Sequence, residues 1–83
     1  MRKIINLSEL EIGQFAIVDS IELKGSIRRR VSDIGLIKGT CVKCIQKAYK
    51  GNPTAYCIRG AVIALRKQDT DLIKVILCNG GAR

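Results

Sequence analysis

A helical repeat of apolar residues, followed by glycine-rich turns, is the clearest pattern in the sequence and spans residues 25–41. Ile27, Val31 and Ile34 fall at intervals of four and three residues, which places their side chains on one face of an α-helix. Ser26 precedes this face, so we expect its hydroxyl to cap the helix by accepting from a first-turn N–H. A helix of about two turns is marginal alone, so the rest of the chain must support it.

Glycines mark the end of this helix. Gly35 can adopt the left-handed conformation that terminates helices, with Leu36 packing back onto the last turn. Lys38 and Gly39 suit the middle of a type II turn, because glycine accepts the positive φ that the third position requires. The pattern therefore predicts a helix, a tight turn and the start of a strand in quick succession.

Alternating apolar and polar residues predict strands over most of the remaining chain. Turn residues separate five such segments, which cover residues 14–23, 41–48, 54–59, 61–66 and 71–78. Five short strands at close spacing favour a small antiparallel β-barrel. The expected fold is therefore mainly β, with one or two short helices.

The phase of the alternation indicates which residues fill the core. The inward positions of the last four strands are Val42, Cys44, Tyr56, Ile58, Ile63, Leu65, Ile73, Val75 and Leu77. The first strand has two candidate faces, and its pattern does not decide between Phe15/Ile17/Ile21/Leu23 and Ala16/Val18/Ser20/Glu22. Side chains fill a barrel of this size, so we expect any binding to occur on its surface.

The chain of 83 residues is interpreted as one domain over residues 1–83. Its core is expected over residues 5–78, with a frayed glycine-rich tail at 79–83. A single helical turn is expected around Leu7–Leu10, with Asn6 or Ser8 as its cap.

The charge balance bounds the possible partners. Fifteen Lys and Arg residues against seven Asp and Glu give a formal net charge of +8, which suits an acidic protein, nucleic acid or an anionic membrane surface, or simply a solvated basic surface. No apolar run approaches the roughly 20 residues of a membrane span, and the N-terminus lacks the apolar core of a secretory signal. We therefore expect a cytoplasmic protein with reduced cysteines.

Four cysteines are the only candidate metal ligands of note. Cys41 and Cys44 form a CxxC pair, whereas Cys57 and Cys78 lie alone in separate strands. A tetrahedral Fe(II) or Zn(II) site needs converging ligands, but residues three apart on a regular strand point to opposite faces. The phase allows Cys41, Cys57 and Cys78 to share the outer face. The alternative is that all four are small buried or half-buried residues.

An enzyme has little support in this sequence. It contains no histidine, and no pair of carboxylates falls in a predicted pocket. The glycines near the C-terminus do not open a helix, as a phosphate-binding loop would. We therefore predict no catalytic activity.

The run Arg28-Arg29-Arg30 is the main candidate for partner binding. Guanidinium groups on a helix suit docking to carboxylates of an acidic protein. The alternative is structural: Arg29 or Arg30 pairs with Asp33 and packs its stem on the barrel, while Arg28 is solvated.

Two further interpretations stay open. Single-stranded nucleic acid would need aromatic stacking platforms, and the chain offers only Phe15, Tyr49 and Tyr56, the last of which is expected in the core. Exposed Ile76, Phe15 or Ile17 on an edge strand would favour a homo-oligomer.

An ordered set of motifs runs along most of the chain. It comprises Leu7, Leu10 and Gly13, then Ala16, Val18 and Ile21, the segment Arg29-Arg30-Val31-Ser32-Asp33-Ile34-Gly35-Leu36, the turn Lys38-Gly39-Thr40 with Val42, the turn Gly51-Asn52-Pro53, and Ile63-Ala64-Leu65-Arg66 with Asp69, Ile73 and Val75. This set resembles the FeoA family, the small cytoplasmic companions of the bacterial ferrous iron transporter FeoB. Val31, Lys38 and Asn52 replace the more usual leucine, proline and aspartate.

The resemblance implies an SH3-like barrel without catalysis. It also implies a role in ferrous iron uptake, by docking on the cytoplasmic part of FeoB to regulate or assemble it, with contact to the membrane only through the transporter. Candidate contacts are Arg28, Arg29, Arg30 and Lys38. Binding of nucleic acid, or of a transition metal through the cysteines, is the alternative.

Overall fold

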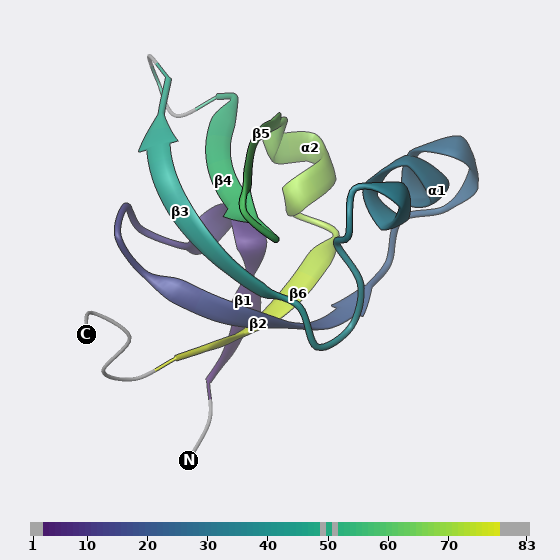
Figure 1. Cartoon of the computed structure of the whole chain (residues 1–83), viewed down its shortest axis with the longest axis horizontal. Helices are drawn as coiled ribbons and strands as arrows, with labels where there is room; N and C mark the ends of the chain where they lie inside the picture. The colour runs from purple at the N-terminus through teal and green to yellow at the C-terminus, as the bar shows by residue number, and fades with distance from the viewer. Residues whose placement is uncertain (1–2, 49, 51, 79–83) are drawn as a thin grey trace.

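A six-stranded antiparallel sheet, curled around one core, makes up most of the computed structural model, which describes residues 3–48, 50 and 52–78 (Figure 1). The strands follow the order β1-β6-β2-β3-β4-β5 across the sheet. Their bounds are β1 Ile4–Asn6, β2 Phe15–Ile21, β3 Cys41–Lys47, β4 Thr54–Ile58, β5 Ala61–Leu65 and β6 Ile73–Leu77. The five predicted strands are confirmed, and β1 is an additional sixth.

Strand β1 was not predicted because it is only three residues long and forms by pairing with the distant strand β6. Ile4 pairs with Ile76 and Asn6 with Lys74. The 3-10 helix η1, Leu7–Glu9, follows as expected, but neither predicted side-chain cap forms. The Asn6 side chain instead accepts from the Lys74 ammonium. The Ser8 hydroxyl donates to the Asp71 carboxylate, so both residues join η1 to the C-terminal part of the sheet.

Strand β2 uses both of its candidate faces because a β-bulge interrupts it. Val18 pairs with Val75 and Ser20 with Lys74, so Asp19 is the extra residue. Ala16 and Val18 face the core before the bulge, and Ile21 packs against the core after it. An inserted residue reverses the alternation of a strand, which explains why the sequence pattern did not select one face.

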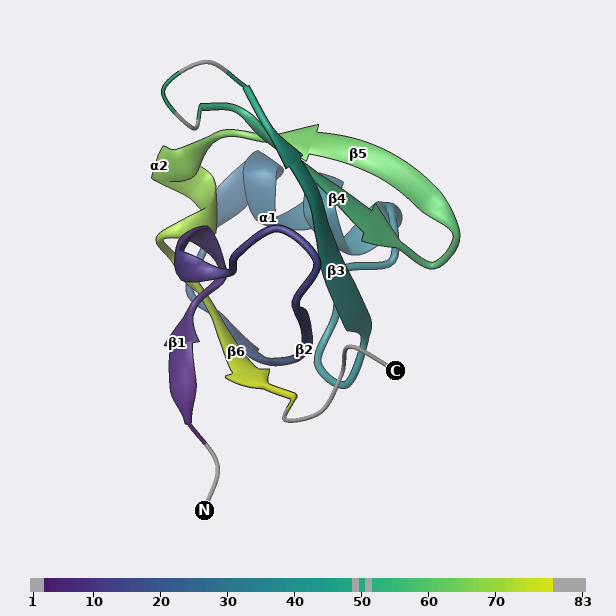
Figure 2. The ribbon, with the colours of Figure 1, turned by 90° about the vertical axis from the view of Figure 1, so that its left-hand side faces the viewer.

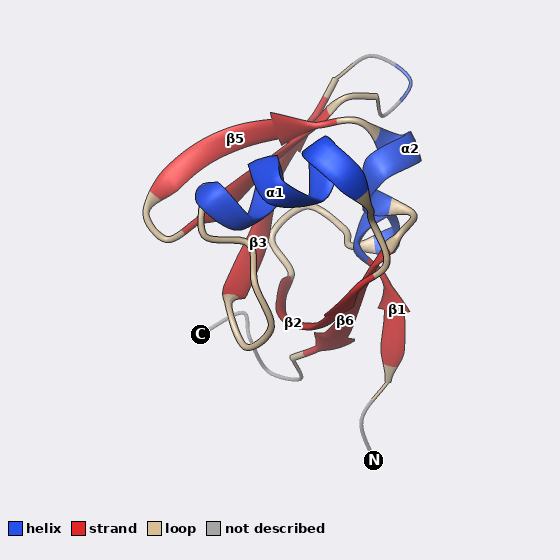
Figure 3. Ribbon diagram, turned by 90° about the vertical axis from the view of Figure 1, so that its right-hand side faces the viewer, coloured by secondary structure: helices blue, strands red, loops and turns tan. Residues whose placement is uncertain are grey.

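Helix α1, Gly25–Asp33, lies beside the barrel (Figure 3). The predicted Ser26 cap is wrong: the helix begins at Gly25, Lys24 is the N-cap, and no side chain caps it. The C-terminus forms as predicted. Gly35 has φ +98°, and the N–H of Leu36 donates to the Val31 carbonyl at 2.9 Å, which completes a Schellman motif.

Short connections complete the barrel. The turn between α1 and β3 has Gly39 at φ +92° and a 3.0 Å bond from the Thr40 N–H to the Ile37 carbonyl, as a type II turn requires. Arg59 and Gly60, both at positive φ, form the hairpin between β4 and β5. The turn expected at 67–70 is the short helix α2, Lys67–Thr70. Figure 2 shows these connections at the ends of the strands, with β1 and β5 at the two edges of the curled sheet.

The core contains nearly all the residues that the alternation predicted. Its buried apolar side chains are Leu7, Leu10, Ala16, Val18, Leu23, Val31, Leu36, Val42, Cys44, Tyr56, Ile58, Leu65, Ile73 and Val75, with Ile63 and Leu77 partly buried against them. Within the described residues, no helix is long and apolar enough to cross a membrane. The expected tail at 79–83 and the expected aromatic Tyr49 lie outside the described residues.

Candidate functional site: a groove between α1 and β5

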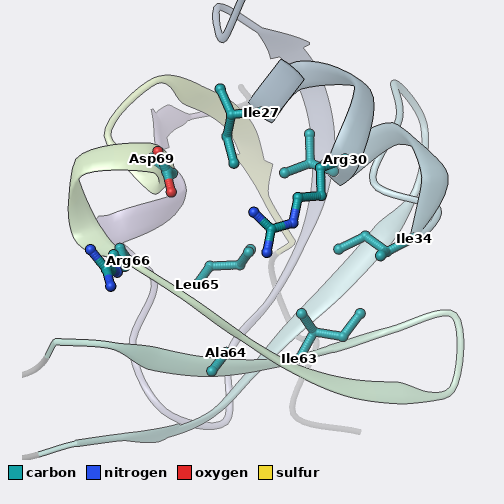
Figure 4. A pocket seen from close by; sticks show the side chains of 9 residues that line it. Ile27, Arg30, Ile34, Ile63, Ala64, Leu65, Arg66 and Asp69 are labelled. Atoms are coloured by element: carbon teal, nitrogen blue, oxygen red, sulfur yellow. The ribbon is translucent and has the colours of Figure 1, made fainter. Parts of the chain in front are cut away.

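A groove of about 220 Å³ lies between α1 and β5 (Figure 4). We call it the α1–β5 groove, and its lining residues come from α1, β5 and the start of α2: Ile27, Arg30, Val31, Ile34, Ile63, Ala64, Leu65, Arg66 and Asp69. The lining is mainly apolar with charges along the rim, a combination that suits a side chain of a partner better than a small polar metabolite.

Each wall of the groove follows from a local pattern. The 3.6-residue repeat of α1 buries Val31 and leaves Ile27 and Ile34 half-buried at the groove. Ile63 on β5 is half-buried opposite them because the edge strand has no neighbour on that side. The groove therefore exists where the helix and the sheet edge fail to cover each other.

Arg30 reaches across this groove. Figure 4 shows its guanidinium extending from α1 toward β5, over Leu65. The ion pairs in the described part of the chain are Lys47–Glu11 and Lys67–Asp71, so the predicted pairing of Arg29 or Arg30 with Asp33 does not occur. Arg29 and Arg30 are exposed, and their charges are available to a partner.

Arg28 has the structural role that the sequence suggested for its neighbours. Its Nη1 donates to the carbonyl of Ile21 and, at 3.4 Å, to that of Leu23, so it joins α1 to the end of β2. Lys38 is exposed on the turn after α1. Arg28 and Lys38 also line a second hollow of about 340 Å³, which continues the basic surface around the helix.

The two cysteines of the CxxC pair do not converge. Cys44 is fully buried and Cys41 is exposed, so the two thiols of the CxxC pair lie on opposite faces of β3, as predicted. Burial, and then the nearby Cys78 and Cys57, raise the pKa of the Cys41 thiol. No group of three or more Cys, Asp or Glu side chains in the described residues is placed to hold a metal ion.

The aromatic side chains offer little stacking surface. Tyr56 is 1% exposed, and its hydroxyl donates to the Leu7 carbonyl. Phe15 is half-buried, with the Lys43 ammonium 5.1 Å from its ring centre. Tyr56 and Phe15 thus provide no open platform of the kind that single-stranded nucleic acid uses.

Sequence reasoning found Arg30 but missed its partners in the groove. Ile63, Arg66 and Asp69 lie 30 or more positions beyond the end of α1, and only the tertiary fold brings them to the helix. A weak signal existed in the sequence: Arg66 directly follows Leu65, an apolar residue at the end of a predicted strand.

The fold and this surface define a small SH3-like barrel with a basic, partly apolar groove. The FeoA domain family matches residues 5–77, and the chain belongs to this family of proteins associated with ferrous iron transport. The resemblance that the motifs indicated is thus confirmed.

Individual relatives agree with this assignment. The chain is 31% identical over 78 residues to an Fe(2+) transport protein A/Fe(2+) transporter FeoB fusion protein of Porphyromonas gingivalis. The matched region covers 94% of this chain but only 9% of that protein. The solution structure of the FeoA protein of Chlorobium tepidum is 32% identical, with a TM-score of 0.86 over 92% of this chain and 72% of that one.

A crystal structure shows the same fold. The FeoA of Stenotrophomonas maltophilia, described as a procaryotic SH3 domain protein and complexed with zinc, is 28% identical, with a TM-score of 0.74 over 90% of this chain and 88% of that one. The SH3-like fold predicted from the resemblance is therefore confirmed.

Proposed function

We propose that this chain is a non-enzymatic accessory protein of bacterial ferrous iron uptake, which docks on the cytoplasmic part of a FeoB-like transporter to regulate or assemble it. The observation that carries the proposal is the Porphyromonas gingivalis relative, in which a FeoA sequence and a FeoB transporter form one chain. Fusion keeps two domains at high effective concentration, which benefits domains that act on each other. The Stenotrophomonas maltophilia relative is described as possibly a ferrous iron transport activating factor, which agrees with this role.

The docking surface is the exposed basic side of α1 with the turn that follows it. Arg29, Arg30 and Lys38 are exposed there, and the chain as a whole carries a net charge of +8. Arg28 contributes charge but is also needed to hold the helix. Such a surface suits an acidic face of a protein, because arginine forks engage carboxylates in a fixed geometry.

The test is the affinity for the full-length FeoB transporter of the same organism in nanodiscs. Arg29→Glu and Arg30→Glu should each weaken binding by about tenfold or more, since each replaces an attraction with a repulsion. Lys3→Glu makes the same charge change beside β1, away from α1 (Figure 1), and should bind as the wild type does. Equal binding by all of the folded variants would overturn the assignment of this surface, and no binding by the wild type would overturn the docking function.

A further inference from the structure

The free edge of β5 borders the α1–β5 groove. Within the part of the chain that the structure describes, β5 ends the sheet and pairs only with β4. Three successive residues, Ile63, Ala64 and Leu65, line the groove. Successive side chains of a strand point to opposite faces, so a groove that touches all three must run along the backbone edge of the strand.

The register shows which backbone groups face outward. The N–H of Cys44 donates to the Gln14 carbonyl at 3.1 Å, so the polar backbone groups of Cys44 point toward β2. Hydrogen bonding alternates along antiparallel strands. Cys44 and Tyr56 therefore form a non-bonded pair, and Tyr56 directs its backbone groups to Ile63 on β5.

The residues on either side of Ile63 point the other way. Val62 and Ala64 direct their N–H and C=O groups to the open edge, where the sheet has no further strand. The Val62 side chain is also 65% exposed. Unpaired edges of this kind are templates for another strand.

We infer that β5 accepts an extended acidic segment of a protein partner as an additional strand; this inference rests on the proposed docking function and specifies its mode. Main-chain bonds to Val62 and Ala64 would supply affinity, and a side chain in the groove would supply selectivity. The space between Ile27, Ile34 and Ile63 takes an apolar side chain.

The charge of the groove selects an acidic segment. Arg30 extends over the groove (Figure 4) and is in no ion pair within the described residues. Arg66 adds a second cation to the rim, against one carboxylate, that of Asp69. A carboxylate on the added strand would meet Arg30 in a site partly screened from water, where charge-assisted bonds are strong.

Proline at position 62 tests this inference directly. Val62→Pro removes an outward N–H without removing a bond to β4, because prolines are tolerated on edge strands whose N–H faces solvent. We expect about a tenfold loss of affinity for full-length FeoB in nanodiscs, the effect of losing one well-formed hydrogen bond. Val62→Ala keeps the N–H, and its affinity should stay within about twofold of wild type.

The opposite edge of the sheet provides a matched control. The N–H of Leu77 donates to the Lys3 carbonyl at 3.0 Å, so Lys3 bonds toward β6 and the next residue, Ile4, directs its N–H outward. Ile4→Pro therefore places the same change on the edge of β1, and we expect unchanged affinity. Melting temperatures and amide spectra verify that each variant is folded.

Hydrogen exchange gives a second readout. Binding should slow exchange of the amides over residues 61–66 in the wild type, and less so in Val62→Pro. Wild-type binding with full affinity in Val62→Pro and no protection of β5 would overturn the strand addition while leaving docking intact. No binding by the wild type would overturn both, and protection of β5 in the isolated protein at high concentration would assign the edge to a second copy of this chain instead.

Discussion

The side chain of Arg59 passes so close to Gly35 that its Cδ atom would clash with a β-carbon on that glycine. Gly35 also has φ +98° at the end of α1. One position thus joins the helix terminus to the β4–β5 hairpin, and only glycine meets both requirements.

Replacement of Gly35 should therefore destabilise the fold strongly. Gly35→Ala combines an unfavourable positive φ, which costs about 1–2 kcal/mol, with displacement of the Arg59 stem. Gly13→Ala is the matched control, because Gly13 has φ +90° but nothing within 4 Å of the added carbon. Denaturant unfolding should show a larger loss for Gly35→Ala, and Arg59→Ala should reduce that excess. Equal losses at the two glycines would contradict the contact.

Replacement of Arg28 should lower the stability of the fold more than replacement of the neighbouring Arg29. Arg28→Ala removes the bonds to the Ile21 and Leu23 carbonyls and should cost about 1 kcal/mol. Arg29 makes no such bond, so Arg29→Ala should change the free energy of unfolding by less than about 0.5 kcal/mol. Urea unfolding at neutral pH measures both values, and an equal loss in the two variants would show that Arg28 does not anchor the helix.

The Asp71 carboxylate should make stability depend on pH in acid. The Ser8 hydroxyl, and then the Lys67 ammonium, lower the pKa of Asp71 from its usual 3.8. The folded state thus prefers the ionised form, and this contribution is fully present above the unfolded pKa and lost as pH falls through the folded pKa. Asp71→Asn should be less stable than wild type at neutral pH, with a difference that shrinks as the pH falls below 3.8.

Ser8→Ala provides the control for this interpretation. It removes the largest cause of the lowered pKa while leaving the carboxylate in place. We expect the free energy of unfolding of Ser8→Ala, measured with denaturant across the acid range, to depend on pH less steeply than that of wild type and more steeply than that of Asp71→Asn. A constant difference between wild type and Asp71→Asn at all pH values would exclude the ionised carboxylate as the source.

The cysteines of the CxxC pair should react very differently with an alkylating reagent. Cys41 is exposed and should be modified in the folded protein, at a rate that rises with pH because the thiolate is the nucleophile. Partial burial and the neighbouring thiols raise the pKa of Cys41, so this rise should come at higher pH than for an unperturbed cysteine. Cys44 is fully buried and should react only when the protein unfolds. Mass spectrometry of Cys41→Ser and Cys44→Ala separates the two sites, and fast labelling of Cys44 in the folded chain would contradict its placement.

Local patterns predicted the elements whose causes are local. The repeat of Ile27 and Val31 and the left-handed Gly35 identified α1 and its end, and alternation identified five strands. The Ser26 cap was wrong because Lys24 already adopts the extended conformation that begins the helix. β1 was missed because its pairing partner, β6, lies about 70 residues away in the sequence.

Local sequence patterns predicted the basic helix of the candidate site but not the groove beside it. Consecutive arginines identify a basic helix, but they do not show that Arg28 bonds to the β2 end while Arg30 crosses a groove. The groove depends on where α1 lies relative to β5, and that placement comes from packing around Val31 and Leu36 rather than from any local signal. The open edge likewise follows from strand order, which alternation does not encode.

The bulge at Asp19 fixes more than the course of β2. One additional residue turns the strand so that Ile21 packs on the core and the chain leaves the sheet toward Gly25. Deletion of Asp19 would restore regular pairing. It would also turn the side chains that follow in β2 to the opposite face of the sheet and redirect the basic helix. A change of one residue in chain length at this point would therefore present the arginines in another direction while keeping the same barrel, and it would act from within the hollow that Asp19 lines together with Arg28 and Lys38.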